Sequence, residues 1–169
     1  MGDSEIGHTE DVKEHIKRNG LTGIEEFLKG QLEEWKKVEI KIGVTGVSGV
    51  GKSSFINAIR GLEDYAQGAA LTDVTERTRK PEAFLHSTNE KIQFWDLPGI
   101  GTPNSPDLDV YCAQVELETY DTFLIFTAGR FMDNDLQLAK KLDSIKKSYF
   151  FVRAKIDQDV ANERRKKHT

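Results

Sequence analysis

The sequence predicts an α/β fold in which helices cover both faces of a mostly parallel β-sheet. From residue 38 onward, predicted strands and helices alternate along the chain, as such a sheet requires. Thr122–Thr127 is an almost wholly apolar run, which is typical of a central parallel strand. A glycine-rich segment, Gly46–Ser53, stands between an apolar strand and a helical pattern. Together these observations predict a three-layer sandwich with a functional loop at the carboxyl edge of its first strand.

The composition is that of one globular domain. The chain has 169 residues, of which 37% are hydrophobic and 31% are charged, so it can bury a core beneath polar helices. The formal net charge of −4 argues against general binding to nucleic acid, which needs a basic surface. Cys112 is the only cysteine, which fits a reducing compartment, and no apolar run approaches the roughly 20 residues that span a bilayer. We therefore expect a cytoplasmic protein with no nucleic-acid partner.

Residues 1–37 are predicted to form a helical segment outside the α/β fold. A short helix is expected near Glu10–Arg18. Thr22 and Glu25 have the spacing of a capping box, which predicts a second helix from there to about Lys37. The apolar residues of this second helix form one stripe at helical spacing: Ile24, Phe27, Leu28, Leu32 and Trp35. We expect the segment to pack on the flank of the main domain.

The main domain is predicted to span residues 38–161, with a basic tail at residues 162–169. Apolar, β-branched and aromatic residues gather in the stretches that we expect to be strands: Val38–Thr45, Glu82–His86, Ile92–Trp95, Thr122–Thr127 and Tyr149–Arg153. Helices are expected at Lys52–Arg60, at Leu108–Glu118, and from a cap at Asp133 to about Lys147. The stretches 61–79 and 98–106 are rich in small residues or proline and are expected to be loops.

The segment Gly46–Ser53 reads Gly-Val-Ser-Gly-Val-Gly-Lys-Ser, a complete G-x-x-x-x-G-K-S phosphate-binding motif. Its glycines let successive backbone N–H groups point at phosphate oxygens, and the helix that follows adds its partial positive charge. Lys52 is expected to reach the β- and γ-phosphates, and the Ser53 hydroxyl is expected to bind Mg²⁺. A chance glycine loop is the alternative, but both flanks are those that the motif needs. The nucleotide-binding residues predicted here are Gly46, Gly49, Val50, Gly51, Lys52, Ser53 and Ser54.

A second motif, Asp-x-x-Gly, follows the predicted strand at Ile92–Trp95. Asp96 is expected to hold Mg²⁺ through water, because Mg²⁺ keeps several waters and prefers hard oxygen ligands. Gly99 is expected to bring its backbone N–H close to the γ-phosphate. An ordinary strand-ending turn is the alternative. The position directly after an apolar strand favours the functional interpretation.

A third motif, Arg153-Ala154-Lys155-Ile156-Asp157, follows the last predicted strand. It approximates the [Asn/Thr]-Lys-x-Asp pattern that selects guanine. The Asp157 carboxylate is expected to accept hydrogen bonds from the guanine N1–H and 2-amino group, a donor pair that adenine lacks. The Lys155 stem is expected to lie along the base. Ala154 departs from the pattern, because an Asn or Thr there braces the base-binding loop in Ras-like proteins. We therefore expect weaker affinity with unchanged base selectivity.

The loop before the second strand contains Thr72, Thr75 and Thr78. A Ras-like GTPase places one threonine here that closes over Mg²⁺ and the γ-phosphate when GTP is bound. All three threonines are candidates. Thr72 and Thr78 are predicted to contact the nucleotide, and Thr78 is also predicted to bind Mg²⁺ and to act in catalysis.

The motifs in combination resemble those of the immunity-related GTPases, which are interferon-inducible, dynamin-like GTPases. The resemblance runs from the N-terminal helices to about Ala161 and rests on Gly46–Ser53, Gly68–Thr78, Phe94–Gly101 and Phe151–Asp157. It implies a Ras-like P-loop NTPase sandwich that hydrolyses GTP to GDP with Mg²⁺. It also implies self-association through the nucleotide face, and peripheral attachment to intracellular membranes in cell-autonomous defence.

Members of that family continue into a last strand and helix of the nucleotide domain and then into a helical domain. This chain stops before both, so we expect either a fragment of a longer protein or a short divergent member.

The resemblance also bears on catalysis. Ras orients its attacking water with a glutamine directly after Asp-x-x-Gly, but Ile100 stands there in this chain and cannot hydrogen-bond a water. Glu76 matches the switch-loop glutamate of the family, which is implicated in hydrolysis when two nucleotide domains meet face to face. We expect slow hydrolysis by the monomer and acceleration on dimerisation. The residues assigned to catalysis are Lys52, Glu76, Thr78 and Gly99.

Two other functions stay open at this point. A P-loop enzyme that uses an adenine nucleotide is disfavoured by Lys155 and Asp157. A nucleotide-binding regulatory module without useful hydrolysis is favoured by Ala154 and Ile100. Glu76 itself has a simpler interpretation as a solvated loop carboxylate.

Overall fold

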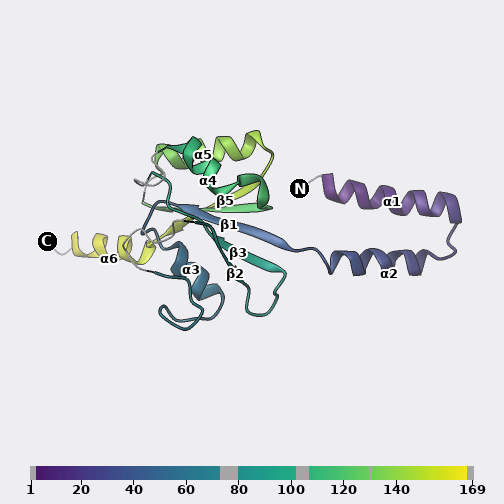
Figure 1. The fold of residues 1–169 in the computed structure, drawn as a ribbon, viewed down its shortest axis with the longest axis horizontal. Coiled ribbons are helices and arrows are strands. Elements are labelled where there is room, and N and C mark those ends of the chain that lie inside the picture. Colours follow the sequence, from purple (N-terminus) through teal and green to yellow (C-terminus); the bar gives the residue numbers. More distant parts are fainter. Residues whose placement is uncertain (1–2, 73–79, 102–106, 130, 167–169) are drawn as a thin grey trace. The chain divides into compact units, whose positions relative to one another are not determined.

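The computed structural model describes residues 3–72, 80–101, 107–129 and 131–166 (Figure 1). It divides into two compact units, Met1–Val38 and Glu39–Thr169. Its helices are α1 (Asp3–Asn19), α2 (Ile24–Trp35), α3 (Lys52–Ile59), α4 (Leu108–Val115), α5 (Asp133–Ser144) and α6 (Ile156–Lys166), with a short 3₁₀ turn, η1, at Leu117–Thr119. Its strands are β1 (Ile40–Gly46), β2 (Glu82–Leu85), β3 (Ile92–Asp96), β4 (Thr122–Ala128) and β5 (Ser148–Ala154).

The first unit is a pair of helices, α1 and α2, in which the ring of His15 stacks on Phe27 with centroids 4.3 Å apart. The predicted capping box is wrong. The residue that caps α2 is Gly23, which has a φ of 76° and makes no side-chain capping bond. Thr22 lies one residue too early to cap. Glu25 instead pairs with Lys29, one turn further along the helix, at 2.8 Å.

The second unit is built on a five-stranded sheet with the order β2-β3-β1-β4-β5. The pairs β1–β3, β1–β4 and β4–β5 are parallel, whereas β2 pairs with β3 antiparallel at one edge. The predicted mostly parallel α/β fold is confirmed. The observed strands differ from the predicted ones by a residue or two at their ends, as expected where strands fray into loops.

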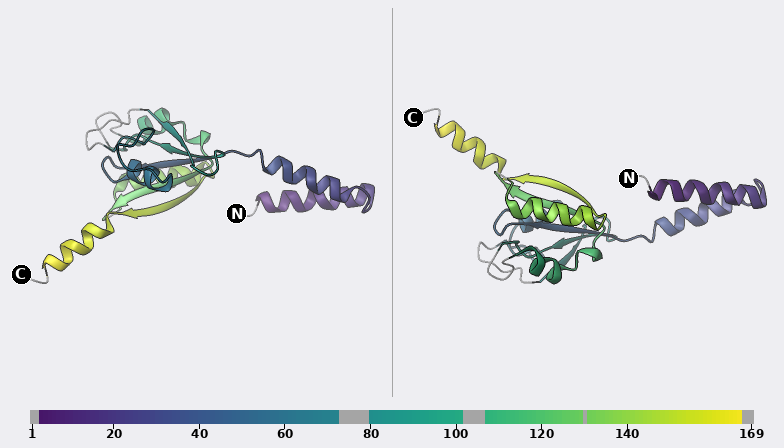
Figure 2. Two further views of the ribbon diagram at one scale, coloured as in Figure 1. Left: turned by 90° about the horizontal axis from the view of Figure 1, so that it is seen from below. Right: turned by 90° about the horizontal axis from the view of Figure 1, so that it is seen from above.

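Helices cover both faces of this sheet, so the unit has three layers. Figure 2 shows α5 on one face and α3 on the other. Alternating residues of β4 supply both cores, since successive strand side chains point to opposite faces. Phe123 and Ile125 belong to a buried cluster with residues of α4 and α5. Phe126 belongs to a second cluster with Ile56 of α3 and Phe94 of β3.

Two helix ends differ from the sequence predictions. Helix α5 is capped at Met132 rather than at Asp133, and the Met132 N–H donates to the Asp135 carboxylate at 3.0 Å. The acidic residue that satisfies the helix end therefore reaches back from within the first turn. Helix α6 carries residues up to Lys166, so most of the predicted basic tail at 162–169 lies in a helix. No residue of α6 among those described is buried.

Candidate functional site

The predicted site residues follow strands whose carboxyl ends meet at one edge of the sheet. The four strands β3, β1, β4 and β5 are mutually parallel neighbours, so their ends lie side by side. Val44 is in register with Asp96, and Gly46 is in register with Phe126. The topology therefore brings the first two motifs together beside β1. The chain runs from β1 to β3 on one side and to β4 on the other, and open α/β sheets bind ligands at such a switch point.

The phosphate-binding segment leaves β1 at Gly46, which no other residue can replace without a shift of backbone. A Cβ atom at Gly46 would lie 2.2 Å from the Phe126 carbonyl oxygen, and its φ is +137°. Gly51 then caps α3 with a φ of +106°, so that the first N–H groups of α3 face the loop. Val50 between them is 2% exposed and packs into the cluster with Ile56, which anchors the loop to the core.

Lys52, the first residue of α3, is buried at 7% exposure. Its Nζ donates to the carbonyl oxygens of Gly46 and Val47, both at 3.3 Å. Burial lowers the pKa of Lys52, and the negative charge of Asp96 opposes that shift. These two bonds are long, so the ammonium group is held only loosely by its own loop. The lysine is thus placed at the loop, where a phosphate group would offer stronger partners.

Ser53 and Asp96 are brought into direct contact. The Ser53 Oγ donates to Asp96 Oδ2 at 2.5 Å, which joins the start of α3 to the end of β3. Asp96 is 2% exposed. A hydroxyl and a carboxylate oxygen are the hard ligands that Mg²⁺ takes, with waters and phosphate oxygens completing its shell. This pair fits the predicted Mg²⁺ site, where the Ser53 hydroxyl would bind the ion and Asp96 would hold it through water.

The residues after Asp96 divide between site and core. Leu97 continues the parallel pairing of β3, because its N–H donates to the Val44 carbonyl oxygen at 3.0 Å. Gly99 is half-buried. Ile100 is 2% exposed and belongs to the core cluster with Leu97 and Tyr111. Ile100 therefore packs in the core.

The loop residues of the prediction are only partly described. Thr72 is half-buried. Thr75, Glu76 and Thr78 lie outside the described residues. Ser54 is exposed on α3, and its Oγ donates to Asp64 at 3.5 Å, the limit of a hydrogen bond.

The predicted base-binding residues lie where β5 passes into α6. Lys155 has a φ of +59° between the two elements, and Asp157 is exposed in the first turn of α6. Ala154 packs against the cluster that contains Phe126. Arg153 and Asp159 pair across this turn at 2.8 Å. The motif is thus presented on an exposed turn that is spanned by an ion pair.

Sequence reasoning missed several polar residues next to the site. Asn57 on α3 is 1% exposed and bonds to both backbone groups of Ala70. The buried hydroxyls of Thr45 and Tyr111 are within 2.5 Å of each other and tie β1 to α4, and burial raises the pKa of Tyr111. A polar residue directly beside Ile56 in the apolar helix pattern was the available signal for Asn57.

Comparison with known proteins gives a family match over nearly the whole chain. Residues 6–169 match the model of the family described as Interferon-inducible GTPase (IIGP). Interferon-inducible GTPase 1 from Mus musculus is 42% identical over 132 residues, which are 78% of this chain and 32% of that relative. Interferon-gamma-inducible GTPase 10 from Mus musculus is 35% identical over 156 residues, which are 92% of this chain and 37% of that relative. The chain spans about a third of the length of these curated relatives.

A solved structure supports the fold independently. The mGMPPNP-bound NFeoB from S. thermophilus matches with a TM-score of 0.55 at 22% identity, over 73% of this chain and 46% of that chain. At this identity the likeness speaks for a shared G-domain fold alone.

Proposed function

Because this chain belongs to the interferon-inducible GTPase family, we propose that it binds guanine nucleotides with Mg²⁺ and hydrolyses GTP to GDP. The observation that carries the proposal is the convergence of Lys52, Ser53 and Asp96 at the carboxyl edge of β1 and β3. A buried ammonium group and two hard oxygen donors, brought together where β3 ends and α3 begins, are what a nucleoside triphosphate with Mg²⁺ requires.

The residues divide the work by their chemistry. The N–H groups of the loop from Gly46 to Gly51 would surround the phosphates, and Lys52 would neutralise their charge. Ser53 and Asp96 would hold Mg²⁺, which stabilises the charge that develops during phosphoryl transfer. Asp157 would read the guanine edge.

Titration calorimetry with GDP, GTP and ATP in Mg²⁺ tests this proposal. Heat from GDP and GTP, with none from ATP, is expected because an adenine offers Asp157 no donor pair. Equal heats from ATP and GTP would contradict the assignment of Asp157. No heat from any of the three would contradict nucleotide binding by this chain.

We further propose that the monomer hydrolyses GTP slowly and that pairing with a second copy of the chain accelerates hydrolysis. Ile100 lies in the core, so the group that orients the attacking water must come from elsewhere. Glu76, by its resemblance to the family glutamate, is the candidate when two nucleotide faces meet. The rate per subunit should rise with protein concentration, and Glu76→Ala should remove that rise. A flat rate per subunit would contradict the proposal.

A binding module with weak hydrolysis or none is the second candidate. It is favoured by Ala154, which packs on the core and leaves the base-binding turn without a side-chain brace. Single-turnover hydrolysis separates the two functions. Release of phosphate at high protein concentration supports the GTPase, whereas bound GTP that persists under those conditions supports the module.

The location in the cell is also a proposal. We infer a cytoplasmic protein, with no nucleic-acid partner, that attaches peripherally to intracellular membranes, on the strength of the family resemblance. In the ranges that the structure describes, no helix is long and apolar enough to cross a membrane. Fractionation of cells that express the chain tests the proposal, since recovery in the nuclear fraction would contradict it.

A further inference from the structure

The side chain of Asn57 holds both backbone polar groups of Ala70. The Ala70 N–H donates to Asn57 Oδ1 at 2.6 Å, and Asn57 Nδ2 donates to the Ala70 carbonyl oxygen at 2.9 Å. The Asn57 side chain thus satisfies both the N–H and the carbonyl group of Ala70, as a neighbouring strand does for a residue in a β-sheet. Because both groups are held, the orientation of the backbone at Ala70 is fixed as well as its position.

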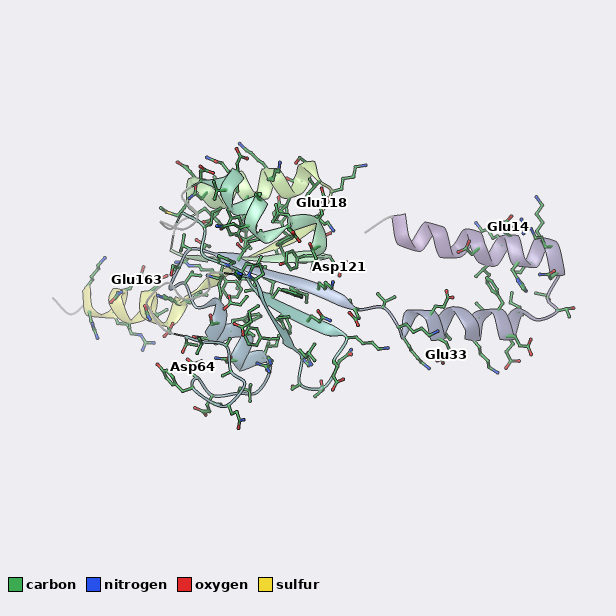
Figure 3. The ribbon with its side chains drawn as sticks, in the orientation of Figure 1. Glu14, Glu33, Asp64, Glu118, Asp121 and Glu163 are labelled. Atoms are coloured by element: carbon green, nitrogen blue, oxygen red, sulfur yellow. The ribbon has the colours of Figure 1, made fainter. Side chains whose placement is uncertain are left out.

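This contact is part of the interior. Asn57 is 1% exposed and Ala70 is 2% exposed. A buried amide is costly unless its hydrogen bonds are made. Asn57 Nδ2 also donates to Asp64 Oδ1 at 2.9 Å, and Figure 3 labels Asp64 on the segment that follows α3. With these bonds made, the network is rigid and specifies one backbone arrangement.

The network joins two parts of the proposed nucleotide site. Asn57 lies on α3, the helix that begins with Lys52. Ala70 precedes Thr72 by two residues and shares a buried apolar cluster with Val50 of the phosphate-binding segment. The stretch that leads to Thr72 is therefore tied to the same helix and the same cluster as the phosphate-binding segment.

A second contact supports the same stretch from the surface. Arg60 Nη1 donates to the Gly68 carbonyl oxygen at 2.8 Å, and its Nε donates to the Leu85 carbonyl oxygen at 2.9 Å. Both bonds are exposed to solvent, so water can replace them at low cost. Loss of the Asn57 bonds should therefore have the larger effect, because water does not reach the buried backbone groups of Ala70 to replace them.

We propose that Asn57 is a positioning residue that favours GTP over GDP by holding Thr72 in place beside the phosphate-binding segment. The proposal rests on the function proposed above. GDP would meet the phosphate-binding segment and the base-binding residues, whereas GTP alone carries the γ-phosphate, for which Thr72 is one of the three candidate threonines. Without the hold on Ala70, the stretch to Thr72 must be ordered when GTP binds, and that entropic cost falls on GTP alone.

The test compares nucleotide affinities of the whole chain and of Asn57→Asp. The aspartate keeps the shape of the side chain, but one of its oxygens then faces two acceptors, the Ala70 carbonyl oxygen and the Asp64 carboxylate. We expect the ratio of dissociation constants, non-hydrolysable GTP analogue over GDP, to rise about tenfold, which corresponds to ordering the backbone of about one residue. Hydrogen exchange of the Ala70 amide in the GDP complex should accelerate in the variant.

Asp64→Ala is the matched control, because it removes one bond of Asn57, together with the 3.5 Å contact from the exposed Ser54 hydroxyl, and leaves both bonds to Ala70. The ratio should stay within about twofold of the parent in this control. If Asn57→Asp fails to fold, Asn57→Ala gives the same comparison, and Asn57→Ser gives it with a smaller loss of polar contact. An unchanged ratio, whether or not both nucleotides bind more weakly, overturns the positioning role while leaving nucleotide binding intact. Failure of the parent chain to bind either nucleotide overturns the proposed function and this inference together.

Discussion

The two ends of the proposed nucleotide site differ in how deeply they are built into the fold. At the phosphate end, Lys52 and Asp96 are buried, and α3 packs on the cluster beneath β1 and β3. At the base end, Asp157 is exposed and lies on α6, of which no described residue is buried. Figure 3 labels Glu163 on α6, the helix that also carries Asp157.

The difference separates stability from selectivity. At the predicted phosphate end, Gly46 is packed tightly against the backbone of Phe126, so a larger side chain there alters folding as well as binding. Base-binding groups lie on an exposed turn, so a change there alters recognition with little effect on folding. Substitutions at Gly46, Lys52, Asp157 and Arg153 test this separation of stability from selectivity.

Gly46→Ala should have the largest effect, because it places a Cβ atom 2.2 Å from a backbone oxygen that cannot move freely. We expect a loss of about 3 kcal/mol in the free energy of unfolding, from overpacking and from strain at a positive φ. Urea denaturation of the chain measures it. Gly49→Ala is the matched control, since a Cβ there has open space and only its φ of +71° is strained, which costs about 1 kcal/mol. Equal losses in the two variants would contradict the packing argument.

Lys52→Ala should abolish measurable nucleotide binding while the chain stays folded. The ammonium group makes only two long bonds to its own loop, so its loss costs little in folding. We expect the dissociation constants of GDP and GTP to rise about 100-fold or more, as for two lost charge-assisted bonds. Calorimetry measures the binding and thermal denaturation measures the fold. Lys29→Ala, an exposed lysine of α2, should leave both unchanged. Retained affinity in Lys52→Ala would contradict the phosphate-end assignment.

Asp157→Asn should change selectivity with no change in the midpoint of unfolding. The amide loses the charge that favours the guanine N1–H and 2-amino donors, so GDP affinity should fall about tenfold. Xanthosine diphosphate should gain affinity, because its 2-oxo group accepts from the new amide N–H. Competition binding measures both. Glu163→Gln removes a carboxylate elsewhere on α6 and should alter neither. A guanine preference that survives Asp157→Asn would place the base elsewhere.

The same contrast explains what the sequence could predict. The phosphate end was predictable because glycine, lysine and serine at fixed spacing leave few alternatives, and the strands β3 and β4 carry strong apolar patterns. Gly46, Ser53 and Asp96 accordingly lie at one edge of the sheet, as the topology requires. Their roles toward a nucleotide stay predictions.

What the sequence could not predict depends on contacts between distant residues or on weak patterns. Helix α6 buries none of its described residues, and Ile156 and Val160 alone give its sequence only a weak apolar pattern for periodicity to detect. The Asn57 bonds to Ala70 join residues 13 apart through a backbone path that no local motif specifies. The cap of α5 comes from Asp135 reaching back to Met132, where the simpler expectation was Asp133.

Arg153→Gln should have the smallest effect and is the sharpest test of the base end. Arg153 and Asp159 are about half exposed, and an exposed ion pair contributes little, so guanine affinity should fall about twofold at low salt and less at high salt. A double-mutant cycle with Asp159→Asn isolates the pair. A coupling near zero would leave the turn braced by its backbone alone, through the Lys155 carbonyl oxygen that accepts from the N–H groups of Gln158 and Asp159 at 3.1 and 3.2 Å. A tenfold or larger loss of guanine affinity would mean that the ion pair braces the turn in place of the Asn or Thr side chain that Ala154 does not provide. The base end would then depend on one surface contact, whereas the phosphate end depends on the core.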